Sequence, residues 1–158
     1  MAFDPMTQRR VMGRFATGVT VVTTGRDNEM YGMTANAVTS LSLDPPLVLV
    51  AVDRRGSMHA HLKRNAFFAV NILRADQEAS SRRFAAPGPK DFSDLTTTTA
   101  ATGAPILSEA IAYVDCRVVE IMPGGDHDIF IGEILAGDAQ DGRPLLFYAG
   151  KYGQLADG

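Results

Sequence analysis

The sequence predicts a mainly β fold, namely a mostly antiparallel barrel of six or seven strands with short helices at its connections and ends. Short apolar runs of strand length recur along the chain, and turn-forming residues separate them. No run approaches the roughly 18 to 20 apolar residues that a membrane-spanning helix needs. The chain has 158 residues, so we expect a single domain over residues 1–158.

The chain is expected to open with a helix. Asp4 is a suitable N-cap, Pro5 fits the first helical position, and a partly apolar face continues until Gly18 ends the helix. The β-branched residues 19–24 then predict a strand. A polar turn leads into a second strand at residues 31–36, so these two strands should form a hairpin.

A polar segment, residues 36–43, connects this hairpin to the next apolar run. It is dense in short hydroxyl and amide side chains. Small side chains let a flat ring approach the backbone, while amide and hydroxyl groups supply donors and acceptors. The segment therefore predicts a ligand-contacting loop. The alternative is a polar edge strand whose Thr and Ser side chains face water.

The apolar run at residues 47–52 predicts a central strand, and the connection after it contains Arg54 and Arg55. Ser57 is placed to cap a short helix that continues through Lys63. A helix N-terminus attracts anions through its free N–H groups and its dipole, and the two arginines add positive charge. We expect a phosphate site here. A solvated turn capped by Ser57 is the alternative.

The second half of the chain should supply the remaining strands and a second helix. Residues 67–73 predict a strand, and Asp76 is placed to cap a helix that runs toward Phe84. The longest strand candidate is 111–122, whose apolar side chains change parity beyond Val118, as a bulge or burial of both faces would cause. Shorter strands are expected at residues 129–136 and 145–148.

Composition narrows the function classes. A formal net charge of -3 and an acidic pI argue against a general nucleic-acid binder, which needs clustered Lys and Arg in excess. Cys116 is the single cysteine and cannot form an intrachain disulfide, and the segment MAFDPMTQRR lacks the apolar core of a signal peptide. A cytoplasmic protein without a membrane anchor is therefore expected.

Other chemistries lack their usual patterns. The sequence has no G-x-G-x-x-G, no P-loop and no G-x-S-x-G elbow. His59, His61, Cys116 and His127 do not have the spacing of a closed zinc site, so no metal centre is predicted.

Four phrases carry a resemblance over nearly the whole chain: in order, FATGVTVVTT, GMTANAVTSLSLDPPLVLVAV, GGDHDIFIGEI and PLLFYAGKY. The chain resembles the flavin reductase family, whose members have an FMN-binding split-barrel fold of Greek-key, mostly antiparallel strands. The resemblance implies a homodimeric reductase that transfers hydride from NADH or NADPH to FMN or FAD. It also implies that a separate flavin-dependent monooxygenase receives the reduced flavin. The cofactors carry such a reaction, and the protein holds their rings in contact.

The resemblance also assigns site residues. The implied flavin contacts are Asn36, Ala37, Val38, Thr39, Ser40, Ser42 and Leu43 in the polar segment, Asp53, Arg54, Arg55, Ser57 and His59 around the phosphate connection, and Phe92 in the loop after the second helix. A lid or dimer contact near Phe92 is also implied, formed by Arg83, Phe84, Lys90 and Asp91. The implied nicotinamide contacts are Asp126, His127, Tyr148, Lys151 and Tyr152. His127 would bond the carboxamide or lie beside the transferred hydride, without acting as a base, and is the one catalytic residue assigned.

Several of these assignments have a plain structural alternative. Gly-Gly-Asp-His is also a good turn, Phe92 can pack back onto its own domain, and the C-terminal tyrosines can be strand packing. Family members often carry Ser and a bulky aromatic where this chain has Ala37 and Val38, so one hydroxyl is missing. A flavin carrier without catalysis and an oxidase of the pyridoxamine-phosphate type remain alternative functions. The choices between FMN and FAD and between NADH and NADPH stay open.

Overall fold

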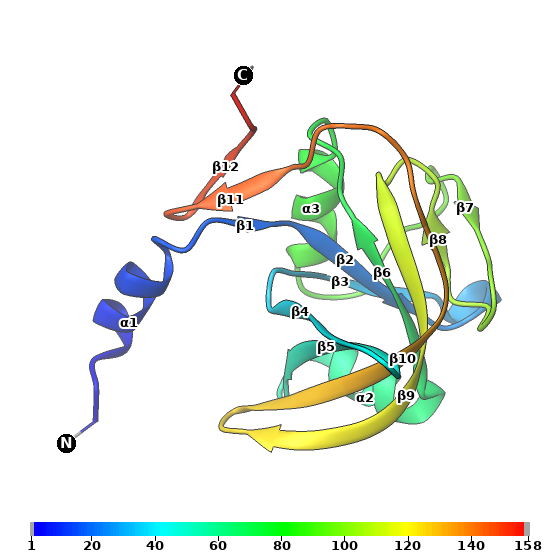
Figure 1. The fold of residues 1–158 in the computed structure, drawn as a ribbon, viewed down its shortest axis with the longest axis horizontal. Coiled ribbons are helices and arrows are strands. Elements are labelled where there is room, and N and C mark those ends of the chain that lie inside the picture. The colour runs from blue at the N-terminus through cyan, green and yellow to red at the C-terminus, as the bar shows by residue number, and fades with distance from the viewer. Residues whose placement is uncertain (1, 157–158) are drawn as a thin grey trace.

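A computed structural model describes residues 2–156 and has a seven-stranded antiparallel sheet at its centre, in the order β3-β2-β6-β9-β10-β5-β4 (Figure 1). Its strands are β2 (Thr20–Thr24), β3 (Tyr31–Ala35), β4 (Val38–Leu43), β5 (Pro46–Asp53), β6 (Phe67–Ile72), β9 (Ala112–Gly124) and β10 (His127–Ala139). The helices are α1 (Pro5–Met12), α2 (Ser57–Asn65) and α3 (Glu78–Ala85), with a 3-10 turn η1 (Asp27–Glu29). There are two smaller sheets among the described residues. One has three strands, β1 (Thr17–Gly18), β11 (Leu146–Tyr148) and β12 (Lys151–Gly153), and the other pairs β7 (Thr97–Thr98) with β8 (Ile106–Leu107).

The large sheet curls around one apolar core. Val22 of β2 and Val50 of β5 lie far apart in the strand order, yet both belong to the same buried cluster with Phe68 and Phe130. These side chains are fully buried because alternate residues of each strand point inward, as the pattern along β5 shows. Helix α2 closes this core with Met58.

Helix α3 organises a second buried cluster on the other side of β2 and β3. Phe84 is 1% exposed and packs with Val21, Leu73 and Leu145. Gly32 of β3 is required here, because a Cβ at this position would lie 2.8 Å from the Phe84 ring. The close approach fixes α3 against β3, and this contact shapes the grooves described below.

Several expectations about the strands are confirmed. Strands β2 and β3 form the expected hairpin, and the seven-stranded sheet matches the expected mainly antiparallel architecture. The parity change beyond Val118 is a bulge: Gly132 pairs with Val118 and Ile131 with Glu120, which leaves Val119 as the extra residue.

The first helix begins where it was predicted but ends earlier, and the polar segment is a strand in place of a loop. Helix α1 ends at Met12, with Gly13 as its C-cap, and Gly18 lies in β1 instead. The segment 36–43 is largely a strand, because β4 pairs with β5 and so satisfies its backbone groups. Since β4 lies at the edge of the sheet, the alternative reading of a polar edge strand holds.

The predicted cap of the first helix, Asp4, is confirmed, whereas those of the second and third helices were wrong. Ser57 is the first helical residue and Gly56 occupies the N-cap, with no side chain accepting a hydrogen bond there. Gln77 occupies the N-cap of α3, while Asp76 pairs with the guanidinium of Arg74 at 2.6 Å. An arginine two residues away therefore takes the carboxylate that the sequence suggested as a cap.

Within residues 2–156, none of the helices combines the length and the apolar character required to span a membrane.

Candidate functional site

The sheet register gathers three of the predicted site segments at one end of the sheet. Strands β4 and β10 both run antiparallel to β5, so the beginnings of both strands lie beside the end of β5. Val38 pairs with Val50, and His127 pairs with Asp53. Helix α2 starts directly after β5. This end of the sheet therefore holds the start of the polar segment, the arginine connection and the Gly-Asp-His turn.

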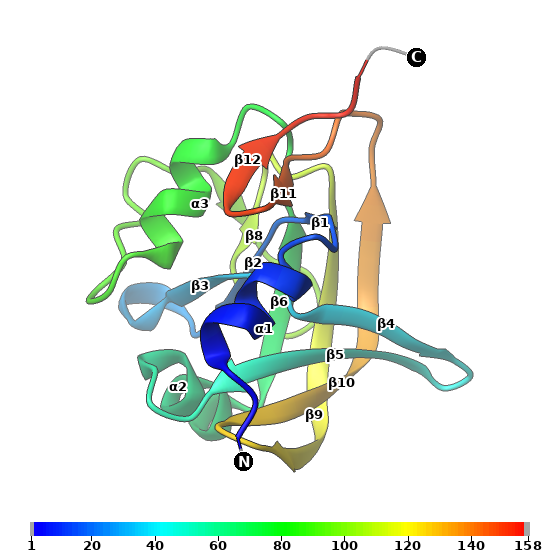
Figure 2. The same cartoon turned by 90° about the vertical axis from the view of Figure 1, so that its left-hand side faces the viewer.

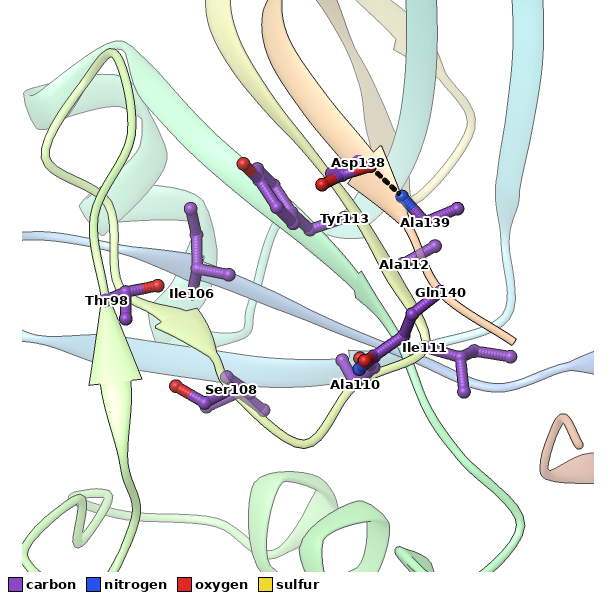
Figure 3. Close-up of a pocket in the computed structure, with 11 residues that line it drawn as sticks. Thr98, Ile106, Ser108, Ala110, Ile111, Ala112, Tyr113, Asp138, Ala139 and Gln140 are labelled. Atoms are coloured by element: carbon purple, nitrogen blue, oxygen red, sulfur yellow. Dashed lines mark hydrogen bonds between the residues drawn. The ribbon is translucent and has the colours of Figure 1, made fainter. Parts of the chain in front are cut away.

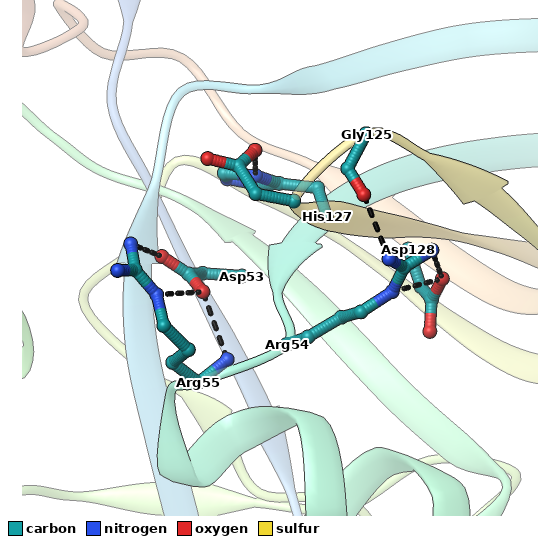
Figure 4. A network of polar contacts seen from close by, with 7 residues as sticks. Asp53, Arg54, Arg55, Gly125, His127 and Asp128 are labelled. Atoms are coloured by element: carbon teal, nitrogen blue, oxygen red, sulfur yellow. Dashed lines mark hydrogen bonds and ion pairs between the residues drawn. The ribbon is translucent and has the colours of Figure 1, made fainter.

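The turn between β9 and β10 is held by a polar network that starts from Arg54 (Figure 4). The Arg54 guanidinium donates to Asp128 Oδ1 at 2.9 Å and to the carbonyl of Gly125 at 2.7 Å. Its backbone N–H donates to the carbonyl of Asp126 at 3.2 Å. His59 Nε2 lies 2.7 Å from the second carboxylate oxygen of Asp128. A short helix and a hairpin turn are thereby joined.

The electrostatics of this end of the sheet favour ionised carboxylates. The hydrogen bond from Arg54, followed by the one from His59, lowers the pKa of Asp128 below its ordinary value. The hydrogen bond with His127 Nδ1, at 2.7 Å, lowers the pKa of Asp126 in the same way. Both groups therefore remain negative beside the histidine near neutral pH.

The N-terminus of α2 borders a groove of about 280 Å³. No side chain caps the helix at Gly56, so the N-terminus of α2 and its dipole can attract an anion. Arg55 is 82% exposed and lines this groove with Ser57, while Lys90 contributes a second cation from the loop after α3. The Arg55 side chain also bonds Asp53 and lowers the pKa of that carboxyl. This geometry suits a phosphate group.

A second groove, of about 200 Å³, continues along β3 and α3, and Ala85 lines both grooves. Asn36 and Tyr152 are among the residues that line it. The Tyr152 hydroxyl lies 2.6 Å from Ser81 Oγ, and the Asn36 amide donates to Thr17 Oγ1 at 3.2 Å. Apolar atoms and a few fixed polar groups together form the type of lining that ring-shaped ligands use. The two grooves suit a molecule with a flat ring and a phosphate tail.

Six of the residues assigned from the sequence line these grooves: Asn36, Arg55, Ser57 and Tyr152 among the cofactor contacts, and Phe84 and Lys90 in the expected lid or dimer contact. Strand β4 leads away from them. The Ala37 carbonyl accepts a hydrogen bond from Ala51, Val38 packs against the core, and Thr39 and Ser40 lie exposed along the sheet edge. Leu43, the residue after Ser42, is 91% exposed at the opposite end of the strand.

Two of the assigned aromatic residues, Phe92 and Tyr148, line neither groove. Phe92 is 8% exposed and packs edge-on against Phe84, with ring centroids 5.2 Å apart. The Phe92 ring, which was expected to stack on flavin, belongs to the second apolar cluster. Burial of this aromatic side chain in the cluster stabilises the loop. Tyr148 is half-exposed on β11, where Arg14 donates to its hydroxyl at 3.5 Å, and Lys151 pairs with it from β12.

Some residues near the site were missed from the sequence. Asp128 links Arg54 to His59, but only the register of β5 with β10 brings these side chains together. Tyr31 lines the phosphate groove and stacks on His61, with ring centroids 4.3 Å apart. Its place in an expected strand gave no functional signal.

A third hollow, of about 290 Å³, lies between β8 and the ends of β9 and β10 (Figure 3). Its polar side chains are those of Thr98, Ser108, Tyr113, Asp138 and Gln140, and the Gln140 amide donates to the carbonyl of Ala110. None of the sequence-assigned residues lines it. Within residues 2–156, no group of three or more His, Cys, Asp or Glu side chains is arranged to hold a metal ion.

Comparisons with known proteins agree with this architecture. The reductase component of 4-nitrophenol 4-monooxygenase/4-nitrocatechol 2-monooxygenase from Rhodococcus opacus is 41% identical, over 98% of this chain and 89% of that protein. The NADH-dependent FAD reductase of Streptomyces globisporus is 41% identical, over 97% and 87% of the two chains. The solved Streptomyces globisporus C-1027 NADH:FAD oxidoreductase in complex with NAD and FAD fragments superposes with a TM-score of 0.91, at 39% identity, over 99% and 97% of the two chains.

The match to a family is equally extensive. Residues 12–156 match the family described as flavin reductase like domain. This range includes both grooves, the α2 N-terminus and the Arg54 network. The chain therefore belongs to the flavin reductase like domain family.

Proposed function

We propose that this protein is an NAD(P)H-dependent flavin reductase, an oxidoreductase that prefers NADH and reduces FMN or FAD. The observation that carries the proposal is the pair of adjoining grooves, which combine an uncapped helix N-terminus beside Arg55 with a ring-sized hollow bordered by Asn36. When bound, the nicotinamide and the flavin supply the hydride chemistry between them. The chain has to bind both molecules and hold their rings in contact.

Each part of the site has a distinct role in this proposal. Arg55 and the N–H groups at Ser57 hold the flavin phosphate by charge and dipole. Asn36 and Tyr152 border the ring-sized groove and orient the ring system. His127 lies at the same end of the sheet, fixed by Asp126, and contacts the nicotinamide. Its role is to position the donor without removing a proton from it.

We propose further that the reduced flavin passes to a separate flavin-dependent monooxygenase. The named role of the Rhodococcus opacus relative as a monooxygenase reductase component supports this. The open edge between β3 and β4, consecutive strands that lie at the two ends of the sheet order, supports assignment as a split barrel. A cytoplasmic location is also proposed, in keeping with a single, buried, unpaired cysteine.

A homodimer is the proposed assembly. The N-terminal arm, residues 2–16, stands away from the sheet in Figure 1 and buries no side chain of α1. Its apolar side chains are strongly exposed, with Met6 at 76%, Phe3 at 67% and Phe15 at 65%. Several strongly exposed large apolar side chains on one short segment favour an interaction site. A second copy of the chain is the proposed partner.

A direct assay tests the catalytic proposal. Purified protein is mixed with NADH or NADPH and either FMN or FAD, and the absorbance of the reduced nicotinamide is followed. Oxidation of the reduced nicotinamide should be accelerated when flavin is added, and it should be faster with NADH than with NADPH. Flavin binding without faster oxidation would instead identify a carrier protein. Absence of any acceleration with either flavin would contradict the enzyme assignment.

A further inference from the structure

The turn that carries His127 has little support of its own. Strands β9 and β10 form a long hairpin, closed by Gly125 and Asp126, and Gly125 has a φ of 73° that suits a tight two-residue turn. The Asp126 side chain is 76% exposed. A hairpin end without buried side chains frays readily, whereas contact between two redox rings requires placement within a fraction of an ångström. Some other element has to hold the turn.

Arg54 supplies that support from the neighbouring strand end. Its guanidinium and its backbone N–H together reach both residues of the turn, Gly125 and Asp126, and Asp128 in the first part of β10. The planar fork of an arginine suits such a multiple contact, which a lysine cannot reproduce. This guanidinium is therefore directed at the turn, whereas Arg55 lines the phosphate groove. Adjacent arginines thus have different tasks.

Asp128 is the centre of the network. One carboxylate oxygen accepts from Arg54 at 2.9 Å, and the other lies 2.7 Å from His59 Nε2. The side chains of Asp128 and His59 are only 16% and 15% exposed, so water competes weakly for these contacts. His59 is in turn held edge-on by the buried ring of Phe130, at 5.5 Å. The turn is thereby connected through α2 to the core.

The network also joins the two halves of the proposed site. His59 belongs to α2, whose N-terminus borders the phosphate groove, and Asp128 follows His127 in β10. Figure 2 shows α2 beside the end of the β9–β10 hairpin. Movement of the turn relative to α2 would break both contacts of Asp128. The distance between the flavin phosphate and the nicotinamide contact is therefore set here.

We propose that Asp128 is a positioning residue, which with Arg54 and His59 fixes the Gly125–Asp126 turn so that His127 meets the nicotinamide. This inference rests on the proposed function. It assigns Arg54 to the nicotinamide side of the site, acting through the turn, in place of the direct flavin-phosphate contact expected from the sequence.

Steady-state kinetics of Asp128→Ala, Asp128→Asn, Arg54→Ala and the Arg54/Asp128 double alanine variant test the proposal. Each single alanine variant is expected to raise the KM for NADH about 10-fold and to leave the KM for flavin within about 2-fold. The double variant should resemble a single one, since members of one network are not additive. Asp128→Asn keeps the shape of the side chain while removing its charge, so it serves as the second variant if Asp128→Ala fails to fold.

The matched control is Glu133→Gln. Glu133 lies on the same strand and forms a comparable ion pair with Arg117 at 2.8 Å, but outside the network. Its kinetic constants should stay at the wild-type values. A rise in the KM for flavin on replacing Arg54, with the KM for NADH unchanged, would overturn the proposal in favour of phosphate binding. Independent, multiplicative effects of Arg54 and Asp128 would also overturn it.

A readout without turnover separates this inference from the proposed function. The NMR signals of the His127 ring should shift or broaden in Asp128→Ala and remain in place in Glu133→Gln. If the wild-type protein oxidised no NADH while the His127 signals responded in this way, the positioning would stand and the enzyme assignment would fail. Unchanged His127 signals in Asp128→Ala would refute the positioning role, whatever the activity.

Discussion

At the scale of single residues, buried polar side chains form hydrogen bonds with backbone groups of neighbouring strands and loops. Asn71 is fully buried on β6, where its amide donates to the carbonyl of Val21 and to Thr23 Oγ1 and its oxygen accepts from the N–H of Leu107. Asp115 is likewise fully buried and accepts from Thr102. Such groups stabilise the fold because every partner is satisfied.

Replacing Asn71 by Ala should destabilise the protein by about 2–4 kcal/mol, because Val21 and Leu107 would keep buried backbone groups without partners. Urea unfolding followed by circular dichroism measures the change. Asn28→Ala in the exposed turn η1 is the control and should fall within about 0.5 kcal/mol of wild type. Equal effects at both positions would contradict a specific role for the buried amide.

Cys116 should be unreactive in the folded protein. Burial raises the pKa of its thiol to about 12, so the nucleophilic thiolate is scarce at mildly alkaline pH, and the side chain is fully buried. A chromogenic thiol reagent should label no sulfur until denaturant is added, and one per chain thereafter. Rapid labelling of the native protein would show that the core around β9 opens readily.

Arg55 has the more direct functional prediction. Removing its charge in Arg55→Ala should raise the KM for flavin about 10-fold, because an exposed guanidinium at a helix N-terminus is lost from the phosphate groove. The KM for NADH should change much less. Arg117→Ala, an exposed arginine elsewhere on the sheet, is the matched control. A similar loss in both variants would point to general electrostatics in place of a phosphate contact.

At the scale of elements, the sequence predicted the apolar strands better than the polar edge strand β4. Short β-branched or apolar runs were sufficient for β2 and β5, because these strands are buried in the sheet. Apolar alternation was sufficient for β9 and even for the bulge after Val118. Strand β4 carries hydroxyl side chains that resemble a loop, and its state depends on pairing with β5. The two-residue strand β1 likewise depends on a distant partner, β11.

The candidate site was predictable to the same extent. A helix N-terminus beside two arginines could be read from local sequence, and Arg55 with Ser57 does line a groove. The direction of Arg54 could not, because it depends on the register between β5 and β10. The packing of Phe92 was not predictable for a related reason, since a loop aromatic packs wherever an apolar neighbour is within reach.

The Arg54 network should show a defined pH dependence. Because its partners lower the pKa of Asp128, the stability from this carboxylate is fully present above the unfolded value of about 3.9 and is lost as the pH falls through the lower folded value. Thermal unfolding should therefore separate wild type from Asp128→Asn at neutral pH, and the gap should begin to close only below about pH 4, as the pH falls through the lower folded pKa. A gap that persisted undiminished in acid would exclude an ionic origin.

At the scale of the whole molecule, the N-terminal arm is the part that one chain leaves unexplained. Helix α1 has a capped N-terminus, with Asp4 accepting from Thr7, yet it buries none of its side chains. An isolated helix of 8 residues is marginal in water, because nucleation costs more than so few hydrogen bonds return. Packing against another surface would supply the missing stabilisation. The proposed homodimer provides that surface.

Introducing a charge into the arm should therefore disrupt the dimer. Met6→Glu places a carboxylate on the exposed apolar face of α1, whereas Gln8→Glu adds the same charge at a polar position of the same helix. Light scattering after size-exclusion chromatography should give twice the chain mass of 16.9 kDa for wild type and for Gln8→Glu. Met6→Glu should shift toward a single chain mass, because a carboxylate buried at an interface is strongly disfavoured. A dimer that tolerated this change would place the interface away from the arm, and a monomeric wild type would refute the assembly itself.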